Sequence, residues 1–477
     1  MKKLKLSSII LSTVLMAMSC TKGLTDLNSN PKKPAAVAAA TLFANAEVGV
    51  TDNLTSTNVN TNIFRLLAQQ WTETTYPDES QYDLSTRNIP QSWWHALYRD
   101  VLADLGECKK IVTADATLAA GVKKNQLAQI DIVSVYTYSV LVNTFGNIPY
   151  TDALNVDNLS PKYDDAKTVY ENLLDRLDAD IAALDVASES FGASDVLYKG
   201  DVAAWKKFAN SLKLRMGMIL VDANTARAKK AVEEAAPNAF TAAEESAIFP
   251  YSTIPPNTNP LWVDLVQSGR LDFVGANTLI DTMNALNDPR RPFFFGQAPG
   301  GGYKGGTYGA SNDYSSFSPV GDLLRAKDFP SVWIDYTEVE FLRAEAIERG
   351  FTVAGAAAVH YTNAVTASIV SWGGTPAQAA TYLADPRVAY ATATGGWKGK
   401  IGVQKWFALY NRGFEAWTEW RRLDYPQLVA PAEALSDIPV RFPYPVSEQN
   451  LNKINYDAAS SAIGGDEVTT KLFWDKF

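Results

Sequence analysis

The sequence predicts a mainly α-helical protein, and three observations support this. Apolar residues recur at helical spacing over long runs at 92–112, 125–146, 164–185 and 202–223. Turns containing Gly, Asp or Pro separate the runs, and strand-like alternation is confined to a few short stretches. Successive helices of about twenty residues joined by short turns are typical of helix-pair solenoids. No clean sequence period repeats, so the solenoid prediction depends on element lengths alone.

The first 19 residues have the pattern of a secretory signal and are excluded from the fold. Three lysines precede the apolar stretch LSSIILSTVLMAM, which at roughly 1.5 Å per residue is too short to cross a bilayer core of about 30 Å. Ser19 and Cys20 then follow as in a bacterial lipobox, although an ordinary cleavage site beside a chance cysteine is the alternative. We expect Cys20 to be lipidated and residues 20–34 to form a flexible tether to the membrane.

The run over 164–185 shows helical periodicity most clearly. Its carboxylates occupy one face, and its apolar residues share the other: Tyr170, Leu173, Leu174, Leu177, Ile181 and Leu184. Asp201 is a suitable N-cap for the helix expected over 202–223.

Later helices are expected over 277–288, 337–350 and 356–374, each ended by Gly or Asp-Pro. Charged residues of the second helix, Glu338, Arg343 and Glu345, are predicted to form its solvated face.

The densest aromatic stretch, 404–422, is predicted to be a core helix and not a sugar platform. On a helix at about 100° per residue, Trp406, Trp417 and Trp420 gather within an arc of roughly 120°, and the charged residues take the opposite side. Gly413 would let another helix approach closely. Trp71 is likewise expected on a helical stripe, within FRLLAQQW.

Two stretches interrupt the helical pattern of the sequence. Residues 296–319 are rich in Gly and Ser yet contain Tyr303 and Tyr308, and residues 389–402 place Trp397 among glycines. Long segments without secondary structure inside a domain are usually functional or disordered. Flexible backbone with many aromatic residues favours a recognition surface, and a disordered spacer is the alternative.

The composition and motifs do not support catalysis. A net charge of −9 without a basic stripe disfavours nucleic-acid binding. The two histidines, His95 and His360, are far apart and are expected to be partly buried polar groups, and Cys108 is expected to be a buried, inert thiol. No zinc, EF-hand or GxSxG motif occurs, and GGYKGGT fails the phosphate-loop pattern. We predict no catalytic residue, metal or cofactor, although scattered carboxylates leave calcium open. A surface glycoside hydrolase is the alternative, because it needs only two carboxylates.

Several segments, in order, resemble the SusD/RagB-like nutrient-binding outer-membrane lipoproteins of Bacteroidota, and most closely their second large branch. They are the lipobox with DLNSNP after it, FGNIPYTDA (145–153), LYKGDVAAWKKFANSLKLRM (197–216), the aromatic stretch ending in RRLDYP, and IPVRFPYPVSEQNLN (438–452). Together with YDDAKTVYENLLDRL, LNDPRRP (286–292), FLRAEAIERG and ASIVSWG, they extend the resemblance over nearly the whole mature chain.

The resemblance implies one all-helical domain over 20–477, built on tetratricopeptide-like helix pairs with an irregular, loop-rich C-terminal part packed on them. It also implies a lipid-anchored outer-membrane protein that faces the cell exterior and has no catalytic residues. Such a protein captures oligosaccharide and acts as the lid of a SusC-like TonB-dependent transporter. The same role for peptides is the alternative.

A sugar ring stacks on an exposed aromatic face, so the best candidates are aromatic residues outside helical stripes. Loop 72–90 supplies Tyr76 and Tyr82. Trp93 and Trp94 are adjacent and so point in different directions, and Trp262 follows three prolines. The Gly-rich stretches supply the rest. The candidate ligand-binding residues are Tyr76, Tyr82, Trp94, Trp262, Tyr303, Tyr308 and Trp397, with core packing or transporter contact as the alternative for each.

Overall fold

Helices dominate the structure, a computed structural model that describes residues 37–476. The first half contains α2 (Ala39–Thr55), α3 (Phe64–Leu67), α4 (Ile89–His95), α5 (Ala103–Ala114), α6 (Ala120–Phe145), α7 (Ala166–Ala183), α8 (Val202–Leu220) and α9 (Thr225–Ala235). The second half contains α10 (Pro260–Trp262), α11 (Asn277–Ala285), α12 (Arg291–Phe294), α13 (Tyr336–Glu348), α14 (Ala357–Ser371), α15 (Pro376–Leu383), α16 (Gly396–Ala408), α17 (Gly413–Leu423), α18 (Val446–Leu451) and α19 (Lys453–Ala462). The all-α prediction is confirmed.

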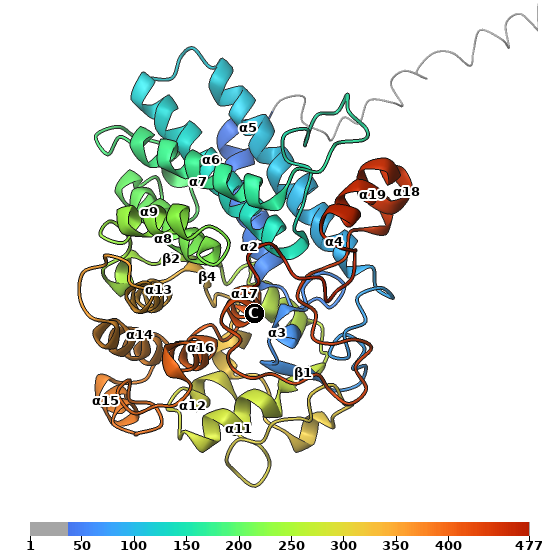
Figure 1. The fold of residues 1–477 in the computed structure, drawn as a ribbon, viewed down its shortest axis with the longest axis vertical. Helices are drawn as coiled ribbons and strands as arrows, with labels where there is room; N and C mark the ends of the chain where they lie inside the picture. Colours follow the sequence, from blue (N-terminus) through green and yellow to red (C-terminus); the bar gives the residue numbers. More distant parts are fainter. Residues whose placement is uncertain (1–36, 477) are drawn as a thin grey trace, which may run out of the picture. The chain divides into compact units, whose positions relative to one another are not determined.

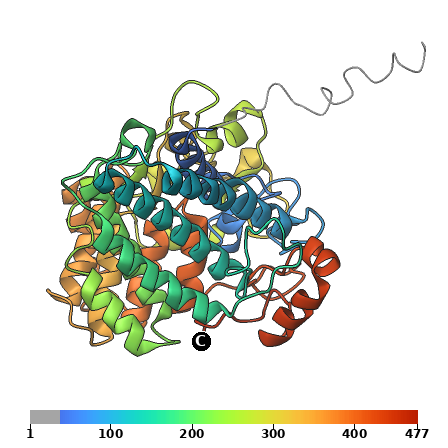
Figure 2. The same ribbon diagram turned by 90° about the horizontal axis from the view of Figure 1, so that it is seen from above.

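Consecutive helices pack as pairs, and the pairs stack on one another. α6 contacts α7, α8 contacts α9, and α13 contacts α14, while α7–α8 and α8–α13 contacts join one pair to the next. Figure 1 shows this stack running from α5 at the top to α15 at the bottom. α18 and α19 lie on the opposite side from α13–α15, as Figure 2 also shows.

Strands have a minor role in the described part of the chain. β1 (Trp71–Glu73) pairs antiparallel with β3 (Phe273–Gly275), with Trp71 opposite Gly275. β2 (Ala247–Phe249) pairs antiparallel with β4 (Ser331–Ile334). Each pair ties an early segment to a later one. Trp71, expected on a helix, is therefore a buried strand residue, and its indole Nε1 donates to the Tyr410 hydroxyl at 2.9 Å.

The N-terminal predictions concern residues that lie outside the described part. They are the signal peptide, the lipidated Cys20 and the tether. Within residues 37–476, none of the helices combines the length and apolar character needed to span a bilayer.

Helix ends follow their local signals. The Asp201 carboxylate accepts hydrogen bonds from the backbone N–H groups of Ala203 and Ala204, at 2.9 and 3.1 Å, and so caps α8 as predicted. The run expected over 92–112 is longer, because α4 continues through a π-helical segment, Ala96–Leu102, into α5. Cys108 lies buried on α5, where burial raises the pKa of its thiol to about 12.

The aromatic stretch 404–422 is core, but it is two helices and not one. α16 ends at Ala408, Asn411 takes a left-handed φ of 68°, and α17 begins at Gly413. Trp406 and Trp417 are buried, as predicted, and α3 lies against α17. A Cβ on Gly413 would stand 2.4 Å from the backbone nitrogen of Arg65, so the close approach predicted for this glycine is confirmed.

The charged residues of α13 are buried, so the prediction of a solvated face is wrong. α8, α14 and α16 all pack against α13, and its residues 337–346 are buried. Glu338, Arg343 and Glu345 are each less than a tenth exposed. Their partners come from other helices as well as their own, with Arg422 of α17 paired to Glu345 and Arg412 to Glu338. The carboxylates remain ionised in the core because arginines compensate them.

Candidate functional site

The most exposed predicted ring, Tyr76, stands on the loop that follows β1. Its side chain is 62% exposed. The Thr74 N–H donates to the Asp272 carbonyl at 2.9 Å, and the Ser311 hydroxyl donates to the Thr74 carbonyl at 2.8 Å. These bonds bring three segments together, 74–78, 270–272 and 311–313, which we call the Tyr76 face.

Exposed polar side chains lie on the same three segments as Tyr76. Arg270 is exposed, and its Nε lies 2.5 Å from the Asp272 carboxylate. Asp78 and Asp313 are exposed as well. A ring with flanking carboxylate and guanidinium groups offers a stacking surface together with hydrogen-bond donors and acceptors.

Three of the predicted ligand-binding rings are core residues in the structure. Tyr82 and Tyr308 are buried with their rings 6.4 Å apart, and the Tyr308 hydroxyl donates to the Leu66 carbonyl at 2.8 Å. Trp94 is buried against Phe145, with ring centroids 5.0 Å apart. Because neighbouring atoms cover these rings, they present no face to a ligand. The Tyr82–Tyr308 contact nevertheless joins the two loops that the sequence singled out.

The other three predicted rings are half-buried and lie apart from Tyr76. Each has a cation near its ring: Lys327 Nζ lies 4.7 Å from the Trp262 ring centroid, while the guanidinium carbons of Arg291 and Arg349 lie 5.7 Å from Tyr303 and 5.1 Å from Trp397. Trp397 is in the first turn of α16 and not in a loop. Within residues 37–476, no hydrogen bond or ring contact joins these three residues to Tyr76.

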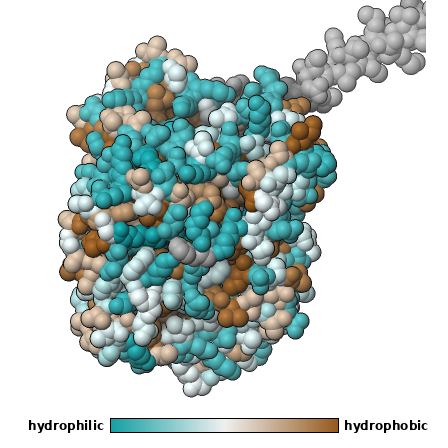
Figure 3. All heavy atoms as spheres, in the orientation of Figure 1, coloured by the Kyte–Doolittle hydropathy of each residue, from teal (hydrophilic) through white to brown (hydrophobic). Residues whose placement is uncertain are grey.

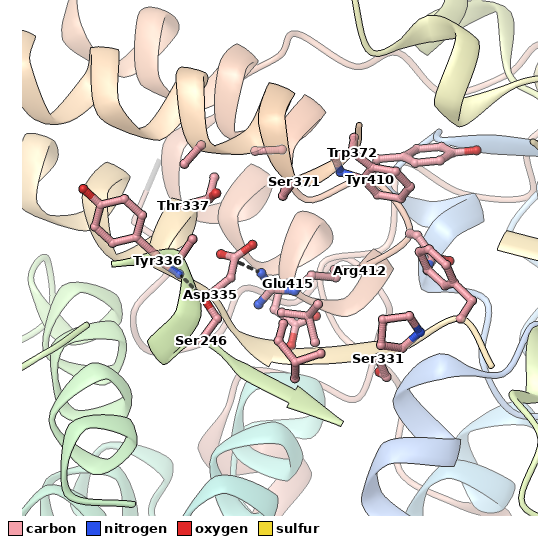
Figure 4. Close-up of a pocket in the computed structure, with 18 of the residues that line it drawn as sticks. Ser246, Ser331, Asp335, Tyr336, Thr337, Ser371, Trp372, Tyr410, Arg412 and Glu415 are labelled. Atoms are coloured by element: carbon pink, nitrogen blue, oxygen red, sulfur yellow. Dashed lines mark hydrogen bonds and ion pairs between the residues drawn. The ribbon is translucent and has the colours of Figure 1, made fainter. Parts of the chain in front are cut away.

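A pocket of about 220 Å³ opens elsewhere, between the helix-pair stack and the aromatic stretch. Its walls are Tyr336, Trp372, Tyr410 and Phe329, and its floor is formed by Asp335, Arg412 and Glu415. Figure 4 shows the three charged residues between Tyr336 on one side and Trp372 and Tyr410 on the other. We call it the Glu415 pocket.

Ion pairs fix the floor of this pocket. The Glu338 carboxylate lies behind the floor, 2.6 Å from Arg215 Nε and 2.5 Å from Arg412 Nη2. Burial would raise the pKa of Glu338, but these two cations outweigh it and lower the pKa. Burial raises the pKa values of Asp335 and Glu415, which have weaker partners. Sequence reasoning missed this site because it treated the charges of 404–422 as lying opposite the core. Charged residues within so aromatic a stretch were the available signal.

Neither histidine lies in these two sites. His360 Nδ1 is 2.9 Å from Glu340 Oε2, and its Nε2 is 2.8 Å from the Ala354 carbonyl oxygen. His95 is half-buried on α4. Over the described range, no three His, Cys, Asp or Glu side chains are grouped so that they could hold a metal ion.

Exposed apolar side chains lie on the α18–α19 hairpin. Figure 3 shows brown, apolar residues where α18 and α19 lie in Figure 1. Leu451 and Ile454 are 79% and 85% exposed there. The Asn455 side-chain amide donates to the Ser160 carbonyl at 3.0 Å and so ties the hairpin to the loop that exposes Val156 and Leu159. Exposed apolar patches of this kind mark interaction surfaces.

Comparison with known proteins gives one family and many similar structures. The SusD-like_2 family model, described as starch-binding and associating with the outer membrane, matches residues 31–445. No curated protein sequence matches the chain.

Solved structures that resemble the chain include several SusD homologues. A chitin-binding one from Flavobacterium johnsoniae is 24% identical, with a TM-score of 0.77 over 92% of this chain and 98% of that one. A SusD-like protein from Bacteroides thetaiotaomicron is 25% identical, also with a TM-score of 0.77 over 92% and 98%. A Bacteroides uniformis homologue is 25% identical, with a TM-score of 0.77 over 91% and 99%.

Proposed function

Since the chain belongs to the SusD-like_2 family, we propose that it captures oligosaccharide at the cell surface and passes it to a SusC-like TonB-dependent transporter as the transporter's lid. The family is associated with the outer membrane, and its members are binding proteins without catalytic activity. The match over residues 31–445 carries the proposal. Two relatives in the same fold bear chitin-binding names, which favours a glycan ligand over a peptide.

We propose the Tyr76 face as the place where glycan binds. The exposed Tyr76 ring supplies a stacking surface, and Arg270, Asp272 and Asp313 supply polar groups for sugar hydroxyls. An open face also suits a chain ligand better than a closed cavity does. Trp262, Tyr303 and Trp397 remain half-exposed candidates for secondary contacts.

The transporter contact and the lipid anchor are further parts of the proposal. The exposed Leu451 and Ile454 on α18–α19, with Leu159 of the adjoining loop, support a protein partner that covers this surface. Lipidation of Cys20, with display on the outer surface, would hold the protein beside that partner.

Affinity electrophoresis of the mature chain against a polysaccharide panel that includes starch and soluble chitin tests glycan capture. We expect retardation by at least one glycan, and loss of retardation in Tyr76→Ala. Val186→Ala is the matched control, because Val186 is 63% exposed and lies outside the Tyr76 face. Unchanged retardation in Tyr76→Ala would exclude the Tyr76 face. Reducing ends should not accumulate, and sustained hydrolysis would instead indicate a glycoside hydrolase.

Two further variants test the partner and the anchor. Replacing Leu451 and Ile454 by Asp should reduce copurification with the transporter while leaving glycan retardation intact. Cys20→Ser should release the protein from the membrane fraction, and unchanged fractionation would contradict lipidation.

A further inference from the structure

The Glu415 pocket has a floor with more negative than positive charge. Asp335 and Glu415 line the floor together with Arg412, and Glu338 and Arg215 lie behind it, so that three carboxylates stand against two guanidinium groups. The next cation to Glu415 is Arg65, which interacts more strongly with Asp264 than with Glu415 and donates to the carbonyls of Thr55 and Ser56. Lys405 is held 2.9 Å from Glu419. Arg215 and Arg412 both bind Glu338 most closely, so the pocket is left with two incompletely compensated carboxylates.

Of these two carboxylates, Glu415 has the weaker protein contacts. Its Oε1 lies 3.5 Å from the Tyr136 hydroxyl and 3.9 Å from Arg215 Nη1, both at the long limit for such contacts. Its Oε2 receives no hydrogen bond from another side chain in the described part of the chain. The Glu415 side chain is nonetheless nine-tenths buried and lines the pocket. A cation that enters the pocket would lower the free energy of a carboxylate buried in this way.

Asp335 has stronger contacts, but its negative charge is still incompletely compensated. Its Oδ1 accepts the Glu338 N–H at 2.8 Å and lies 3.3 Å from Arg412 Nη1. Arg412 is thus already shared between two carboxylates. Its one unpartnered nitrogen, Nε, is itself buried and offers no donor to an incoming ligand. The floor therefore disfavours an anion and favours a cation.

The walls of the pocket suit an organic cation better than a hydrated metal ion. Trp372 and Phe329 stack with ring centroids 5.9 Å apart, and Tyr336 and Tyr410 also line the space. Aromatic faces attract ammonium groups through the ring quadrupole. Ile248 and Leu323, at the rim, are partly exposed, which opens the pocket to solvent.

The size of the pocket limits its ligand. Its volume of about 220 Å³ lies below the range of about 300–1,000 Å³ usual for drug-sized ligands. A single ring fits this space, whereas an oligosaccharide chain does not. The pocket shares no lining residue with the Tyr76 face.

We propose that the Glu415 pocket is a separate binding site for a small organic cation, a primary ammonium group on a single ring, of which amino sugars are one class. The ammonium group lies between the carboxylates of Asp335 and Glu415, and the ring lies against Trp372. This site does not depend on glycan capture at the Tyr76 face.

A series of ring ligands that differ in charge tests the site by calorimetric titration of the mature chain. Cyclohexylamine, protonated at pH 7, should bind at least about tenfold more tightly than cyclohexanol, since only the former has a cation for the carboxylates. Glucosamine should likewise bind more tightly than glucose. Tighter binding of cyclohexanecarboxylate would show an anion site, and equal binding of the amine and the alcohol would show a merely apolar cavity. Either result, or no amine binding at millimolar concentrations, would overturn the proposal.

Substitutions locate the amine. Glu415→Gln keeps the size of the side chain and removes its charge, and should weaken cyclohexylamine binding by about tenfold or more. Glu433→Gln is the matched control, because Glu433 is exposed and does not line the pocket. If Glu415→Gln is folded by circular dichroism and binds the amine as tightly as the parent, the assignment is wrong.

Discussion

Replacing Gly413 by Ala should destabilise the protein, although alanine is the better helix former. Gly413 is the first residue of α17, where α3 crosses it. An added Cβ would lie 2.4 Å from Arg65 N, 2.7 Å from Phe64 C and 2.9 Å from Arg65 Cα. All three are backbone atoms, so relief of the clash requires α3 and α17 to separate. Arg65 also donates to the carbonyls of Thr55 and Ser56, which resist that movement.

The magnitude follows from two opposing effects. Overpacking a well-filled core costs about 1–3 kcal/mol. Replacing glycine by alanine within a helix returns at most about 1 kcal/mol, and less at the first helical position. We therefore expect Gly413→Ala to lower the free energy of unfolding by about 1–2 kcal/mol.

Urea denaturation followed by circular dichroism measures the change, with Gly106→Ala as the matched control. Gly106 lies within α5, and the nearest atom to a Cβ there is Leu154 Cδ1 at 3.8 Å, an ordinary contact. Gly106→Ala should stabilise the protein by about 0.5–1 kcal/mol. If Gly413→Ala shifted the midpoint upward as Gly106→Ala does, the steric argument would be refuted.

Three other predictions concern buried or half-buried groups. His360 faces Glu340, Arg343 and the Ala354 carbonyl, and its hydrogen bond with Glu340 raises its pKa above the ordinary value of about 6.5. The protonated His360 therefore stabilises the fold fully below about pH 6.5, and this stabilisation is lost as pH rises through the folded-state pKa. His360→Gln should lower the urea midpoint most at acidic pH, and a pH-independent difference would contradict this. Cys108, with a pKa raised to about 12, should react with a thiol reagent at pH 8 only after denaturation, and rapid native labelling would contradict burial. Glu338→Gln leaves two buried arginines undercompensated and should cost about 3–5 kcal/mol in urea denaturation; a change below about 1 kcal/mol would contradict the ion-pair account.

The helices were predictable because their signals are local. Apolar spacing placed α6, α7 and α8 to within a few residues, and Asp201 marked the start of α8. The interruption of the helix at 409–412, between α16 and α17, could not be predicted in this way. There the helical pattern continues through the sequence, and contacts with α3 fix Asn411 in a left-handed conformation, with its side-chain oxygen accepting from Arg65 Nε at 2.9 Å.

The candidate sites were harder to predict than the fold. Loop position identified Tyr76, whose ring is exposed, but the same criterion also selected Tyr82 and Tyr308, which pack on each other. A loop ring is buried or exposed according to what folds over it, and the covering segments here lie more than 200 residues apart in sequence. Aromatic residue type alone cannot distinguish the two outcomes.

The sequence by itself determined the helical class, the Asp201 cap, the core role of Trp406 and Trp417, and the family resemblance, because each depends on neighbouring residues or on ordered motifs. Only the tertiary structure decided which charges are buried. Glu338 meets Arg412 and Arg215 across 74 and 123 residues of chain, and the free energy of a buried carboxylate depends on such partners and not on its own helix.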